Sequence, residues 1–136
     1  MKKAYLILGF IVTIFVLPEF SYGQKNIGEF NRNEYEVLDT LRKEEDALGY
    51  SKVIGSQSTP LALKQYISKA KTVLTKYEER LQACRNALKN LSEIPSNQIK
   101  TNYEYKSTTE GIIFEYEFSI KAVKNRIESA EKKLKG

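Results

Sequence analysis

Few side chains in this sequence could do chemistry, and none of them forms a known catalytic pattern. The chain contains no histidine and a single cysteine, Cys84. Without histidine it lacks the commonest general base near neutral pH and the usual activator of a serine or cysteine nucleophile. A lone cysteine at an apolar position behaves as a small hydrophobic side chain and cannot form an intrachain disulfide. We therefore expect no enzyme activity, no catalytic residue and no cofactor.

Two acidic clusters are the remaining candidates for chemistry. Glu115 and Glu117 are two residues apart, and on a helix such residues point in different directions. Glu44, Glu45 and Asp46 are consecutive, without the alternating oxygen ligands and the glycine of a calcium loop. Both clusters are typical of solvated charges, so we expect neither a metal site nor a small-molecule ligand.

Aromatic side chains are better candidates, because they suit protein binding. Phe114 and Phe118 are one helical turn apart and lie outside the apolar face of the helix predicted around them. They either pack on the first helix or form an exposed apolar patch for a partner. Tyr103 and Tyr105 precede that helix in a long connection, where binding residues concentrate. The alternative for these tyrosines is a structured turn that covers the end of the bundle. The candidate partner-binding residues are thus Phe114, Phe118, Tyr103 and Tyr105.

The N-terminus is typical of an export signal. Lys2 and Lys3 precede 14 uncharged residues, 4–17, fewer than the roughly 20 that a membrane-spanning helix needs. Pro18 then interrupts the helix, and Ser21 and Gly23 are small enough for a signal peptidase. We expect a signal peptide over residues 1–23 and a periplasmic or secreted mature chain with no stable membrane span. An uncleaved membrane anchor is the alternative.

Three helices are predicted in residues 24–136, which we interpret as one domain. Asn31 and Asn33 each stand three residues before a glutamate, as helix caps do, and predict a first helix over 34–48 that stops at Gly49. Thr59 followed by Pro60 begins a second helix over 60–92. A capping box over residues 107–110 opens a third helix over 109–135.

An apolar seam runs along each of the two longer helices, with residues alternately three and four apart. The seam of the second helix comprises Leu63, Ile67, Ala70, Leu74, Tyr77, Leu81, Cys84, Leu88 and Leu91, and that of the third Ile113, Tyr116, Ile120, Val123, Ile127, Ala130 and Leu134. The pattern predicts an all-α fold, a long antiparallel coiled-coil-like helical hairpin with the shorter N-terminal helix packed alongside as a three-helix bundle.

One segment also has a strand-like pattern. Residues 103–106 and 114–118 alternate with period 2, so that a β-hairpin over 102–119 is an alternative to the helix. An isolated two-stranded unit is marginally stable, and the seam continues to residue 134, so the helix is favoured.

The charge is unevenly distributed along a chain whose net charge is +5. Residues 24–50 carry four basic and seven acidic side chains, whereas residues 51–92 carry eight basic and two acidic ones. This indicates an acidic first helix that lies along a basic second helix. The alternative is an anionic surface or nucleic acid as partner. The basic residues flank both sides of the second seam instead of forming one face, so we expect no nucleic acid.

These observations favour an exported, non-enzymatic interaction or assembly protein of the cell envelope. It would bind a protein partner, or itself as a homo-oligomer, through its helical faces. A periplasmic chaperone-like holdase for unfolded envelope proteins is the alternative.

Overall fold

The computed structural model describes residues 24–55, 58–91 and 99–136, without the side chains of residues 24–26 and 99–103. The predicted signal peptide, residues 1–23, lies outside the described residues. Four helices account for nearly all of the described chain: α2 (Gln24–Asp46), α3 (Tyr50–Val53), α4 (Pro60–Leu91) and α5 (Ile99–Lys135). The all-α prediction is confirmed for this part of the chain.

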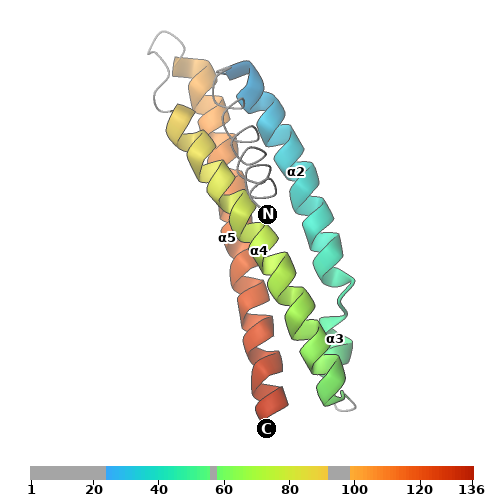
Figure 1. The fold of residues 1–136 in the computed structure, drawn as a ribbon. Helices are drawn as coiled ribbons and strands as arrows, with labels where there is room; N and C mark the ends of the chain where they lie inside the picture. Colours follow the sequence, from blue (N-terminus) through green and yellow to red (C-terminus); the bar gives the residue numbers. More distant parts are fainter. Residues whose placement is uncertain (1–23, 56–57, 92–98) are drawn as a thin grey trace, which may run out of the picture.

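The helices α2, α4 and α5 pack side by side as a bundle, and α4 with α5 is the main pair (Figure 1). The chain runs along the bundle in α2, returns in α4 and runs out again in α5 (Figure 1). Consequently α2 is parallel to α5 and antiparallel to α4. The predicted three-helix bundle is therefore confirmed.

Both ends of the connection between α2 and α4 follow local rules. Gly49 has φ 65° and ψ 47°, the left-handed conformation that glycine adopts at little cost after a helix. The hydroxyl of Thr59 accepts a hydrogen bond from the backbone N–H of Ala62 at 3.1 Å, which caps α4 as predicted. Lys133 in the last turn of α5 donates to the carbonyls of Ile54 and Gly55 at 2.7 and 2.6 Å. This contact fastens the connection to the end of the bundle.

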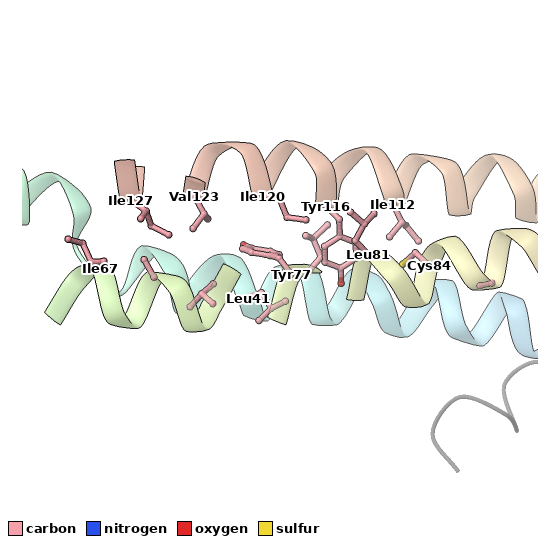
Figure 2. Packing of buried hydrophobic residues seen from close by; sticks show 14 of the residues in the cluster. Leu41, Ile67, Tyr77, Leu81, Cys84, Ile112, Tyr116, Ile120, Val123 and Ile127 are labelled. Atoms are coloured by element: carbon pink, nitrogen blue, oxygen red, sulfur yellow. The ribbon is translucent and has the colours of Figure 1, made fainter. Parts of the chain in front are cut away.

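The predicted seams form most of the core, which lies along the axis between the helices (Figure 2). Cys84, Tyr77, Tyr116 and Val123 are fully enclosed, and Tyr77 and Tyr116 meet edge to face at 6.1 Å between ring centroids. The partly buried seam residues are Leu74, Leu88, Ile113 and Leu134. Removal of this apolar surface from water is the main force that holds the three helices together.

Two predicted helix starts are wrong, and for a common reason. Both α2 and α5 begin about ten residues earlier than predicted, at Gln24 and Ile99. Asn31, a predicted cap, and Thr109, which belongs to the predicted capping box, lie inside the helices, are buried, and hydrogen bond to each other at 3.0 Å. Because α2 and α5 run parallel, each early segment supplies the surface on which the other packs. The same extension makes residues 102–119 helical, so the β-hairpin alternative is excluded.

The buried face of α5 is also shifted from its predicted position. Ile112 is fully buried, whereas Ile113 is only partly buried. The predicted seam considered contact with α4 alone. Since α2 also packs on α5, the buried face is rotated toward α2, and it includes Ser119.

Among the described side chains, three ion pairs cross between α4 and α5 at intervals of seven residues, and we call them the charged rungs. They are Lys71–Glu131 at 3.7 Å, Glu78–Lys124 at 3.8 Å and Arg85–Glu117 at 3.3 Å. Their polarity alternates, because α4 contributes a cation, then an anion, then a cation. A slip of seven residues between the helices would therefore place like charges opposite each other, which disfavours the wrong register.

Candidate functional site

The aromatic residues predicted to bind a partner lie on the outer surface of α5. Phe114 is 66% exposed and Phe118 64% exposed. Of the two alternatives, packing on the first helix is therefore excluded, and the two side chains form an exposed apolar surface. Instead, Arg42 of α2 forms an ion pair with Glu115 at 2.5 Å and approaches the hydroxyl of Ser119. Because α2 takes this edge of α5, the two phenylalanines are left facing away from both neighbouring helices.

A third exposed aromatic residue is Tyr35 of α2. It is 50% exposed. It stands four residues after Asn31 and seven before Arg42, and therefore shares the helix face whose two members contact α5. On α5, a Cβ added at Gly111 would meet nothing within 4 Å beyond its own stretch of helix, so the space beside this residue is open. We call Phe114 and Phe118 the aromatic patch.

The two candidate tyrosines upstream have a different setting. Tyr105 is partly buried and packs on α2, where a Cβ at Gly28 would lie 3.1 Å from its ring. The predicted settings, a long connection or a structured turn, are both wrong, because positions 103 and 105 lie within the helix α5. The side chain of Tyr103 lies outside the described residues.

A buried polar cluster joins all three helices, and sequence reasoning missed it. Glu34 of α2 is 1% exposed. Its carboxylate accepts a hydrogen bond from the Tyr116 hydroxyl at 2.7 Å and forms an ion pair with Arg80 of α4. Its spacing is the signal that could have revealed it. Glu34 stands four residues after Phe30 and four before Leu38, on the face that α2 buries.

This cluster has the properties of a structural centre. Each oxygen of Glu34 accepts from a donor of the protein, Tyr116 or Arg80, and the carboxylate is almost completely shielded from solvent. Burial, and then the hydrogen bond to Glu34, raise the pKa of Tyr116 far above the ordinary tyrosine value. A phenol that keeps its proton and a buried carboxylate bonded to two other helices are suited to holding the helices in register, not to proton transfer.

Four of the five acidic residues considered for chemistry form separate ion pairs. Glu44 pairs with Lys76 at 2.6 Å, and Glu45 pairs with Arg126. Glu115 points to α2 and Glu117 to α4, so these carboxylates do not converge. Within the described ranges, no three His, Cys, Asp or Glu side chains come close enough together to hold a metal ion. The ion pairs between α2 and α4 agree with the prediction that an acidic first helix lies along a basic second helix.

Two further tyrosines are perturbed by their surroundings. Burial, and then the negative charge of Glu45, raise the pKa of Tyr66 to about 12. The same two causes, in the same order, raise the pKa of Tyr77 to about 12.

We predict that these tyrosines make the bundle sensitive to alkali. A folded-state pKa above the unfolded value of about 10 means that the contribution to stability is complete below pH ~10. It is lost as pH rises through about 12. Absorbance at 295 nm, recorded with circular dichroism, should show Tyr66 and Tyr77 ionising together with loss of helix. In Tyr77→Phe the alkaline loss of melting temperature should be smaller. Ionisation of all tyrosines near pH 10 with the helix intact would contradict this prediction.

No family model, no curated protein and no solved structure matches this chain. Among the helices that the structure describes, none is both long and apolar enough to cross a membrane.

Proposed function

We propose that this chain is an exported, non-enzymatic interaction or assembly protein of the cell envelope, or a secreted one. It binds a protein partner through the aromatic patch on α5. One observation carries the proposal: two phenylalanines one turn apart are each about two-thirds exposed. Soluble proteins usually cover contiguous apolar surface, and large aromatic side chains dominate the energy of many interfaces.

Two features of the molecule support a binding role over a catalytic one. The buried carboxylate of Glu34 is bonded to Tyr116 and Arg80, and Glu44, Glu45, Glu115 and Glu117 are each paired with a basic side chain. The aromatic patch needs no such internal partner, and Phe118 is not part of the core. Export is supported by Lys2, Lys3 and the uncharged run that follows them.

The expected partner offers an apolar pocket or groove that accepts two aromatic rings spaced one helical turn apart. Helix-in-groove recognition uses anchors with this spacing. Charged side chains of both signs border the rings on α5, for example Glu117 and Lys121, so charge alone does not define the partner.

The test replaces Phe118 with aspartate in the full chain. We expect the free energy of unfolding to change by no more than about 0.5 kcal/mol, because the side chain is exposed. Affinity for a partner captured by the native chain should fall at least about 30-fold, as for the loss of an aromatic hot spot. Thermal melts and binding isotherms with the captured partner measure the two effects.

Leu61→Asp is the matched control. Leu61 is 65% exposed at the start of α4, near the far end of α5, and undergoes the same change from apolar to charged. It should bind the partner like the native chain. Normal stability together with normal binding in Phe118→Asp would refute the proposed site. Capture of many unfolded chains, in place of one partner, would favour the holdase.

A further inference from the structure

The side of the α4–α5 pair that faces away from α2 is a second candidate surface. Two grooves run along it, with volumes of about 580 and 370 Å³, and only residues of α4 and α5 line them. Leu81 and Ile120 line the larger groove, and Ile67 and Leu134 the smaller one. The helix α2 contacts the opposite side of α4, where Lys76 and Arg80 reach its carboxylates.

The charged rungs lie along this same side. Glu78, Lys124, Arg85 and Glu117 line the larger groove, and Lys71 and Glu131 the smaller one. Their side chains are 44–57% exposed, and the paired atoms are 3.3–3.8 Å apart. Each carboxylate has oxygen lone pairs left for a second cation. The surface therefore combines an apolar floor with three regularly spaced charge pairs whose polarity alternates.

The charged rungs of one copy are complementary to those of a second copy under one symmetry. Consider two copies that face each other across these grooves, related by a two-fold axis parallel to the helices. Then α4 of one copy lies over α5 of the other, and each rung lies over the same rung. Lys71 meets Glu131 of the second copy, Glu78 meets its Lys124, and Arg85 meets its Glu117. A two-fold axis across the helices would instead place α4 over α4, and Glu78 would meet Glu78.

We propose that a second copy of this chain docks on the α4–α5 face, with the two-fold axis along the bundle. The two α4–α5 pairs then form a four-helix core, with each α2 on the outside. This surface is distinct from the aromatic patch, so the inference goes beyond the proposed function.

The test exchanges the charges of all three rungs in one full-length variant: Lys71→Glu, Glu131→Lys, Glu78→Lys, Lys124→Glu, Arg85→Glu and Glu117→Arg. Within one chain every ion pair remains, with reversed polarity, so folding should be retained. Two copies of the variant are again complementary. A variant copy and a native copy, in contrast, meet with like charges at every rung.

We expect the native chain and the rung-exchanged variant each to dimerise reversibly in sedimentation experiments. In an equimolar mixture of mass-labelled copies, random pairing would give heterodimers as about half of all dimers, as for any two-fold homodimer. Native mass spectrometry should find them at least about tenfold below that level, because like charges oppose mixed pairing.

Two control variants show whether the charged rungs themselves determine the pairing. Exchanging a pair on the α2 side, with Lys76→Glu and Glu44→Lys, should leave mixing with native copies random. Phe118→Asp should dimerise like the native chain, so failure of the proposed partner site would leave this inference standing. A native chain that stays monomeric up to about 1 mM, the weak end of the affinity scale, would overturn the inference. Random mixing of native and rung-exchanged copies would also overturn it.

Discussion

The variant Glu34→Ala is expected to lose about 3–5 kcal/mol of unfolding free energy, the cost typical of breaking a buried ion pair. The carboxylate is 1% exposed and is the hydrogen-bond acceptor for Tyr116 and the ion-pair partner of Arg80. Its removal leaves a partly buried guanidinium without its counter-charge and a buried hydroxyl without an acceptor. Urea unfolding followed by circular dichroism measures the loss.

Two further variants show whether the cluster, and not a local change in α2, is responsible. Glu36→Ala alters an exposed glutamate of the same helix and should cost no more than about 0.5 kcal/mol. The triple variant Glu34→Leu, Arg80→Leu and Tyr116→Phe removes all the polar groups together. It should recover most of the stability, because apolar replacement of a complete buried ion pair is often neutral. Equal stability of Glu34→Ala and Glu36→Ala would show that the cluster does not support the fold.

The variant Leu81→Ala is expected to lose about 2–5 kcal/mol, the range for truncation of a core leucine. Leu81 lies near the middle of α4, is 7% exposed and belongs to the core with Ile120 (Figure 2). Truncation leaves a cavity that two long helices cannot easily close. Lys69→Ala, at an exposed position of the same helix, is the control for thermal melts. Equal melting temperatures of Leu81→Ala and Lys69→Ala would contradict the assignment of Leu81 to the seam.

Local sequence signals predicted the ends of a helix where residues of that same helix determine them. Thr59 and Pro60 determine the start of α4, and Gly49 the turn after α2. The early parts of α2 and α5 could not be predicted this way, because each is stabilised mainly by the other. The sequence indicated Asn31 as a cap and placed Thr109 in a capping box, and only the packed structure shows that these two side chains are buried against each other.

The candidate site was predicted in part. Phe114 and Phe118 were identified as candidates because they lie outside the apolar seam. Whether α2 covers them depends on the side of α5 on which α2 packs. That choice depends on contacts such as Arg42 with Glu115, which are 73 residues apart and leave no local pattern. Glu34 was missed because a buried glutamate breaks the apolar pattern that identifies a core face. It becomes intelligible only when Arg80 and Tyr116 are brought to it.

The parallel arrangement of α2 and α5 also has a consequence for folding kinetics. The contacts of α2 with α5 join residues 73–82 apart, whereas the Arg85–Glu117 rung joins residues only 32 apart. Glu44 of α2 and Lys76 of α4 are also 32 residues apart, so both antiparallel pairs close short loops at similar entropic cost. Because α4 with α5 is the main packing pair, we expect the α4–α5 hairpin to form first and α2 to dock onto it later. Interactions of Glu34 would then be absent from the transition state. The stability lost in Glu34→Ala should accordingly appear as faster unfolding, with the folding rate almost unchanged.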